Sequence, residues 1–160
     1  MPLPTTTLKG FLRSDGRKGI RNTLLVVYLV ECAHHVVKEI AVNFRDRDVH
    51  VVGFSGCFPS EYAHSMLYRL STHPNVGGVL LVSLGCESFN RGRLQKEIWE
   101  SGRPVHTLVI QERGGTERTV ADGRRWVEST LGEMEKVSRV PLNVKDLVIG
   151  TICGGSDASS

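Results

Sequence analysis

Short apolar runs alternate along this chain with longer segments whose apolar residues recur at helical spacing. The apolar runs cover residues 23–30, 49–54, 76–84, 104–110 and 146–152, and the helical patterns cover residues 34–44, 60–70, 90–102 and 116–137. Strands this apolar are usually covered on both faces, and a helix between two strands is the connection that parallel pairing requires. The alternation predicts an α/β fold with a doubly wound, mainly parallel, five-stranded sheet and helices on both faces.

The length of the chain and the absence of two sequence motifs limit the number of domains and the choice of cofactor. At 160 residues the chain has the size of one domain, so we expect a single Rossmann-like domain over residues 1–160. Neither the G-x-G-x-x-G dinucleotide fingerprint nor a Walker sequence occurs. The sequence therefore argues against NAD as a cofactor.

Charge and hydropathy exclude two classes of partner. The formal net charge is only +3, which is too small a bias to indicate binding to nucleic acid or to an anionic membrane surface. No segment approaches the roughly 20 apolar residues of a membrane helix, and the opening MPLPTTTLKG lacks the apolar core of a signal peptide. We therefore expect a cytoplasmic protein.

The cysteines follow the apolar runs. In the cytoplasm they should be reduced, which favours metal binding or catalysis over disulfides, although no C-x-x-C pair indicates structural zinc. They lie directly after the first, second, third and fifth predicted strands: Cys32, Cys57, Cys86 and Cys153. Because the carboxyl ends of parallel strands meet at one edge of the sheet, all four thiols are predicted at the edge where ligands bind. The alternative for any one of them is that a small residue simply packs in a tight turn.

The same predicted edge carries polar side chains and glycines. Glycines let backbone amides approach a ligand closely, so these loops could bind a carboxylate or a phosphate. The residues concerned are Ser55, Gly56, Glu87, Gln111, Gly114, Gly115, Gly154, Gly155, Ser156 and Asp157.

A basic loop precedes the first predicted strand. Residues 10–22 read GFLRSDGRKGIRN, and we interpret Arg17 and Lys18 as solvated turn residues. A loop that enters a strand approaches its amino end, so Arg21 and Asn22 are expected at the opposite edge, where they hold the loop or serve an interface.

Read in order, these motifs resemble one family. They are DGRKGIRN, CAHHVVKEIA, the Gly56-Cys57 pair, HPNVGGVLLVSLGCE, IQERGGT and CGGSDA, and together they span nearly the whole chain. The chain resembles the altronate and galactarate dehydratases, whose large portion is also found as a separate subunit of sulfolactate sulfo-lyase.

The resemblance implies a metal-dependent lyase that acts on a sugar acid. Such an enzyme removes the proton α to a carboxylate and expels the β-hydroxyl as water, which requires a base, an acid and a cation or donors for the developing enediolate. It implies a divalent metal, with Fe²⁺ expected before Mn²⁺ or another ion, but the family motifs do not determine which residues are ligands. We assign Cys57, Cys86 and Cys153 as ligands and expect Cys86, Glu87 and Cys153 nearest the metal. We further assign Glu87, Gln111 and Asp157 as catalytic residues, and Ser55, Gly154, Gly155 and Ser156 as substrate-binding residues, with Asp157 also placed to orient the substrate. Which group is the base and which the acid stays open.

The resemblance also has two departures. Many relatives carry a histidine four residues before the cysteine that matches Cys57, where this chain has Gly53. Relatives also continue into a large further domain, so we expect this chain to be an amino-terminal fragment of a longer subunit. The implied partners are that carboxyl-terminal domain, a small companion domain or subunit, and a second copy of the chain in a homo-oligomer.

Other aromatic and imidazole side chains admit simpler interpretations. His34, His35, His64 and His73 could each be read as ligands. His35 falls on a family-like HxVxxIA motif close to the predicted edge, whereas His64 and His73 are interpreted as surface or capping residues. The tryptophans and the later arginines are interpreted as core residues and as a solvated helix face: Trp99, Trp126, Arg113, Arg118, Arg124 and Arg125. Two other functions stay open: a cysteine-ligated iron–sulfur or redox protein, and a non-catalytic assembly module.

Overall fold

A parallel sheet forms the centre of the computed structural model, which describes residues 8–152 and 154–155. Its strands run in the order β4-β3-β5-β6. They are β3 (Thr23–Tyr28), β4 (Val49–Gly53), β5 (Val76–Ser83) and β6 (Val105–Val109). All three pairings are parallel, as the apolar runs and their helical connections predicted.

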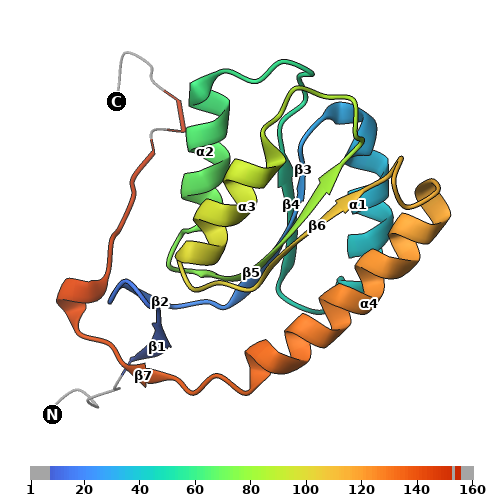
Figure 1. The fold of residues 1–160 in the computed structure, drawn as a ribbon. Coiled ribbons are helices and arrows are strands. Elements are labelled where there is room, and N and C mark those ends of the chain that lie inside the picture. Colours follow the sequence, from blue (N-terminus) through green and yellow to red (C-terminus); the bar gives the residue numbers. More distant parts are fainter. Residues whose placement is uncertain (1–7, 153, 156–160) are drawn as a thin grey trace, which may run out of the picture.

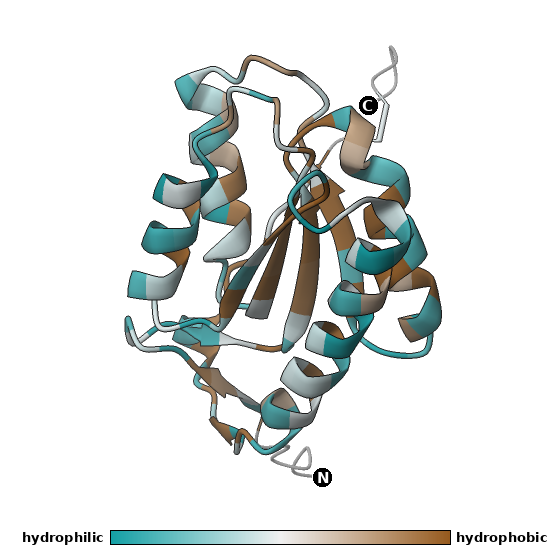
Figure 2. Cartoon of the chain, turned by 45° about the vertical axis from the view of Figure 1, so that its right-hand side comes forward, coloured by the Kyte–Doolittle hydropathy of each residue, from teal (hydrophilic) through white to brown (hydrophobic). Residues whose placement is uncertain are grey.

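Helices cover both faces of this sheet (Figure 1). One face carries α1 (His34–Ala41) and α4 (Thr116–Glu135), and the other carries α2 (Glu61–Ser71) and α3 (Arg91–Glu100). Short 3-10 turns flank α1 at η1 (Glu31–Ala33) and η2 (Val42–Phe44). Figure 2 shows the consequence of this layering, because the apolar strands lie between helices whose outer faces are hydrophilic. The doubly wound α/β fold is therefore confirmed.

Helix boundaries follow ordinary capping chemistry. The Ser60 side chain accepts a hydrogen bond from the amide of Ala63 at 3.3 Å and begins α2, as the sequence suggested. The Asn90 side chain does the same for α3, accepting from the amide of Arg93. No helix among the described residues is long and apolar enough to span a membrane.

The predicted fifth strand is wrong. Residues 147–152 form no strand, and Val148 and Ile149 are 98% and 85% exposed. Upstream, β7 (Val140–Pro141) pairs with β1 (Lys9–Leu12), which also pairs with β2 (Lys18–Gly19), in a small antiparallel sheet that the sequence did not predict. Because β7 pairs with β1 in this second sheet, the chain continues into η3 (Val144–Asp146) and adds no strand beside β6.

The strand order places one topological switch point in the parallel sheet, between β3 and β5. The chain leaves β3 toward α1 on one face of the sheet, whereas it leaves the neighbouring β5 toward α3 on the opposite face. In open α/β sheets, ligands bind at the carboxyl ends of the strands where such a reversal occurs. The turns that follow Tyr28 and Ser83 flank this switch point.

Candidate functional site

Three exposed, unpaired thiols lie on the turns at the carboxyl edge of the sheet. Cys32 follows β3, Cys57 follows β4 and Cys86 follows β5, and these strands are direct neighbours. None of the three is buried in an apolar pocket, which is where a purely packing cysteine is usually found. Cys153 lies outside the described residues, and the strand that was expected to bring it to this edge is absent.

Backbone hydrogen bonds join these turns into one rim. The amide of Glu31 donates to the carbonyl of Ser55 at 3.3 Å, and the amide of Ser88 donates to the carbonyl of Cys57 at 3.0 Å. The amide of Gln111 donates to the carbonyl of Leu84 at 3.1 Å. The turns after all four parallel strands are therefore fixed relative to one another.

Glu87 restrains the turn that carries Cys86. Its carboxylate is 7% exposed and accepts one hydrogen bond from the Ser83 hydroxyl and another, at 2.9 Å, from the amide of Gly85. The Glu87 side chain thus ties Ser83 and Gly85 together, and the exposed Cys86 lies between Gly85 and Glu87 in the chain. In this conformation both oxygens of Glu87 already have donors.

Gln111 lies beside the same turn. A Cβ placed on Gly85 would come 2.7 Å from Gln111 Oε1, and Gly85 has a φ of +122°, which also favours glycine. The close approach brings Gln111 next to the Gly85–Glu87 turn. Of the sequence-predicted site residues, Ser55, Cys57, Cys86, Glu87 and Gln111 therefore share the carboxyl edge.

The remaining predicted site residues are not gathered at this edge by any described strand. Gly154 and Gly155 are exposed and follow the segment that does not join the sheet. Ser156 and Asp157 lie outside the described residues. Within the described chain, no group of three or more His, Cys, Asp and Glu side chains is arranged to hold a metal ion.

Sequence reasoning missed a carboxylate and an aromatic ring at this edge. Nδ1 of His34 lies 2.9 Å from Oε1 of Glu31, and the His34 ring stacks on Tyr28 with a centroid distance of 4.5 Å. Tyr28 ends β3 and is half-buried. The spacing of three residues between Glu31 and His34, directly after a strand, is the sequence signal that could have indicated the pair.

Gly53, where many relatives were expected to have histidine, is packed against this ring. A Cβ on Gly53 would come 2.4 Å from Cδ1 of Tyr28 and 2.4 Å from the carbonyl oxygen of Tyr28. A histidine at position 53 would therefore require Tyr28 to move.

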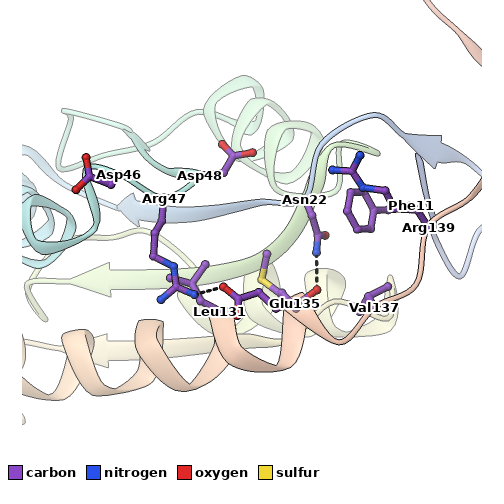
Figure 3. A pocket seen from close by; sticks show the side chains of 10 residues that line it. Phe11, Asn22, Asp46, Arg47, Asp48, Leu131, Glu135, Val137 and Arg139 are labelled. Atoms are coloured by element: carbon purple, nitrogen blue, oxygen red, sulfur yellow. Dashed lines mark hydrogen bonds and ion pairs between the residues drawn. The ribbon is translucent and has the colours of Figure 1, made fainter. Parts of the chain in front are cut away.

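The larger cavities of the described chain lie away from this edge. One of about 570 Å³, shown in Figure 3, is lined by residues that include Asn22, Arg47 and Arg139. Asn22 donates to the carbonyl of Met134 there at 3.1 Å, and Arg47 pairs with Glu135. A second cavity, of about 680 Å³, lies between the β1–β2 turn and residues 145–148. Their internal ion pairs and hydrogen bonds fit structural roles.

Several side-chain interpretations need correction. Lys18 is not solvated, because its ammonium group pairs with Asp146 at 2.9 Å and its side chain is 22% exposed. Arg17, half-exposed, pairs with Asp15 and also donates to the carbonyl of Thr72 at 2.7 Å. Arg21 pairs with Asp48 at 2.6 Å and so holds the loop, as one of the two expectations stated.

Two further interpretations are wrong for a different reason. His64 is buried. Its Nε2 lies 2.8 Å from Oε2 of Glu97 on α3, and its ring stacks on Phe89. Trp99 is 69% exposed on the outer face of α3, whereas Trp126 packs against the core as expected. An apolar period of three to four residues does not show which side of a short helix faces the sheet.

Comparisons with known proteins give the chain its relatives. The family model described as "D-galactarate dehydratase/Altronate hydrolase, second domain" matches residues 10–135. Altronate dehydratase of Bacillus subtilis (strain 168) is 30% identical over 170 residues, which cover 96% of this chain and 33% of the relative. The (2R)-sulfolactate sulfo-lyase subunit beta of Chromohalobacter salexigens is 26% identical over 179 residues, which cover 100% of this chain and 41% of the relative.

Galactarate dehydratase (L-threo-forming) of Escherichia coli (strain K12) is 28% identical over 183 residues, which cover 99% of this chain and 35% of the relative. The chain thus spans between about a third and two-fifths of the length of these curated relatives. No solved structure gives a significant match. Because the family model covers the sheet and all the helices that surround it, the chain belongs to the D-galactarate dehydratase/altronate hydrolase family.

Proposed function

We propose that this chain is part of a hydroxy-acid dehydratase that acts on a sugar acid of the altronate or galactarate type. The enzyme removes the proton α to the carboxylate and eliminates the β-hydroxyl as water. The relatives named altronate or galactarate dehydratase support the reaction class. The observation that carries the location of the site is the switch point between β3 and β5: Cys86 and Glu87 lie on the turn after β5, and Gln111, after β6, lies beside that turn.

The proposal includes a divalent metal, with Fe²⁺ expected before Mn²⁺ or another ion. Cys57 and Cys86 offer two exposed thiols on turns joined by the hydrogen bond from Ser88, and Cys153 would supply a third. The described residues do not complete such a site by themselves. A bound metal would stabilise the enediolate charge that develops when the α-proton leaves.

The chain's own residues would position the substrate and move protons. We propose Ser55, Gly154, Gly155 and Ser156 for substrate binding, and Glu87, Gln111 and Asp157 for acid–base work. For Glu87, a proton-transfer role requires the carboxylate to release Ser83 or Gly85, which both donate to it. Until then, Glu87 fixes the turn on which Cys86 lies.

Turnover should require more than these 160 residues. The relatives are roughly two and a half to three times as long as this chain, and one of them is named as a beta subunit. We propose that a carboxyl-terminal domain and a small companion domain or subunit complete the site, in a cytoplasmic enzyme that forms a homo-oligomer. The 160-residue chain alone should fold and show no measurable dehydration.

The decisive experiment assays the complete subunit that carries this chain, purified without oxygen, against aldonates, aldarates and sulfolactate. Formation of a 2-keto-3-deoxy acid from altronate or galactarate supports the proposal. Release of sulfite from sulfolactate instead would move the substrate to that of the sulfo-lyase relative, which aligns with the whole chain. Turnover of none of these acids would refute the proposed function.

Metal analysis of the same preparation separates the remaining alternatives. A single divalent ion per subunit supports the dehydratase. Iron together with acid-labile sulfide would favour an iron–sulfur protein. Robust turnover by the 160-residue chain alone would show that the active site is misplaced.

A further inference from the structure

We propose that His34, oriented by Glu31, is a further proton-transfer residue of this site beside those proposed above, an inference that rests on the proposed dehydratase function. Neither residue belongs to the proposed ligand or substrate-binding sets. The pair lies where β3 passes into α1, at the carboxyl edge of the sheet.

The position of the pair follows from the strand order. The turn after β3 and the turn after β5 form the two sides of the switch point, and β3 lies between β4 and β5. Glu31 is joined to the turn of Cys57 through the carbonyl of Ser55, and Leu29 donates to the carbonyl of Val82 on β5 at 3.0 Å. His34 therefore begins α1 on the β3 side of the switch point, whereas Cys86 and Glu87 follow β5 on its other side.

The geometry of the ring suits proton transfer. A hydrogen bond between Nδ1 of His34 and the Glu31 carboxylate, 2.9 Å apart, requires the proton on Nδ1 and leaves Nε2 with a free lone pair. The Tyr28 ring, stacked at 4.5 Å and an interplanar angle of 24°, fixes the plane of the imidazole. The side chain is 27% exposed and therefore open to solvent.

His50, His64 and His106 lack this combination. His64 has a carboxylate partner but is buried between two helices, and His106 stacks on Trp126 against the α4 face. His50 has a carboxylate partner, Asp48, yet lies near the amino end of β4, at the opposite edge of the sheet. His34 alone among these joins a carboxylate, an aromatic platform and the carboxyl edge.

The proposed step balances without a further reactant. Nε2 of His34 takes the proton from the α-carbon, and the electrons of that C–H bond enter the forming carbon–carbon double bond. The β-carbon–oxygen bond breaks, and the imidazolium returns its proton to the departing hydroxyl, which leaves as water. The product enol then tautomerises to the 2-keto acid. Glu31 stabilises the imidazolium while it exists and acts as a positioning residue.

The first test compares two histidine variants of the complete subunit. His34→Gln should lower kcat/KM for the sugar acid by about 100-fold or more, the usual contribution of a general base. His50→Gln removes an exposed histidine with a carboxylate partner at the other edge and should leave kcat/KM unchanged. A wild-type subunit that dehydrates a sugar acid while His34→Gln keeps full turnover would overturn the inference and leave the proposed function intact.

The second test does not depend on turnover. Nitrogen NMR of the ring should show the Nδ1–H tautomer in the wild-type chain and a mixture of tautomers in Glu31→Ala. Galactarate or altronate should protect His34 of the complete subunit, but not His50, from modification by diethyl pyrocarbonate, read by mass spectrometry. A mixed tautomer in the wild type, or no protection by either acid, would refute the role of His34 whatever the assay of turnover shows.

Discussion

The ring of Tyr28 lies against Gly53, its register partner on the neighbouring strand. A Cβ on Gly53 would come 2.4 Å from Cγ of the ring and 2.4 Å from the Tyr28 carbonyl oxygen. The same ring also stacks on His34. The lack of a side chain at position 53 therefore determines where Tyr28, and through it His34, can lie.

Gly53→Ala should destabilise the chain. The added methyl group must displace both the ring and a backbone carbonyl, so the free energy of unfolding should fall by about 1–3 kcal/mol in urea denaturation. Gly132→Ala is the matched control, because a Cβ on this α4 glycine meets nothing within 4 Å. It should stabilise the chain by about 0.5–1 kcal/mol, the helical preference for alanine. Equal stability of Gly53→Ala and the wild type would contradict the packing described.

Glu87→Ala tests whether the carboxylate has a structural role. Its loss leaves the Ser83 hydroxyl and the Gly85 amide without their acceptor, which should cost about 1–3 kcal/mol of unfolding free energy. Glu112→Ala is the control, since that carboxylate is 67% exposed in a surface pair with Arg91. If Glu87→Ala leaves the stability of the chain unchanged but abolishes turnover of the complete subunit, Glu87 is a catalytic group that does not restrain the turn.

The sequence indicated most of this fold because the central strands are buried on both faces. Residues 23–28 and 76–83 are apolar without alternation, and that pattern has few structural solutions other than a covered parallel sheet. The run at 146–152 is equally apolar yet exposed. Whether residues 146–152 form a strand depends on whether a partner strand lies beside them. The preceding β7 pairs instead with β1, a contact between residues more than 120 positions apart in the chain.

The location of the candidate site could be predicted from the sequence, but not all of its residues. Glycine and cysteine at strand ends indicated the edge, because turns of parallel strands need small residues and meet on one side. The Glu31–His34 pair was overlooked because its meaning depends on which turns flank the switch point, and that follows from the strand order β4-β3-β5-β6. Sequence periodicity predicts strands and helices but does not determine the order of strands in a sheet.

Arg103→Lys should be among the most destabilising substitutions of a charged residue in this chain. The guanidinium group is 3% exposed and donates to the carbonyls of Val76 at 3.1 Å and Thr72 at 2.8 Å, as well as to Ser101. A lysine cannot satisfy these acceptors together, so the free energy of unfolding should fall by about 2–3 kcal/mol. Arg69→Lys, on the exposed face of α2, should change little. Similar denaturation midpoints for the two variants would show that Arg103 is not a structural link.

Asp48 should contribute to the acid sensitivity of the chain. Burial raises the pKa of its carboxyl group, but hydrogen bonds from Arg21 and Thr23 outweigh this and lower the pKa below the ordinary value. A lowered pKa adds stability above the unfolded value of about 3.9 and loses it as the pH falls through the folded value. Asp48→Asn should therefore reduce the loss of stability below about pH 4. Unfolding curves of both proteins from neutral to acid pH check this, and parallel pH profiles would exclude the contribution.

The cysteines of the edge provide the last prediction, because a thiolate ligand and a packing thiol respond differently to serine. In the complete subunit, Cys57→Ser, Cys86→Ser and Cys153→Ser should each lower the metal content and the turnover, since serine is nearly isosteric but a much poorer soft ligand. Circular dichroism should be unchanged, because Cys57 and Cys86 are exposed and their removal opens no cavity. Cys32→Ser changes a third exposed thiol of the edge that is not among the proposed ligands, and it should keep its metal. Normal metal content and turnover in all of these variants would mean that thiols at the carboxyl edge are not ligands, and that the charge of the enediolate is stabilised by other groups.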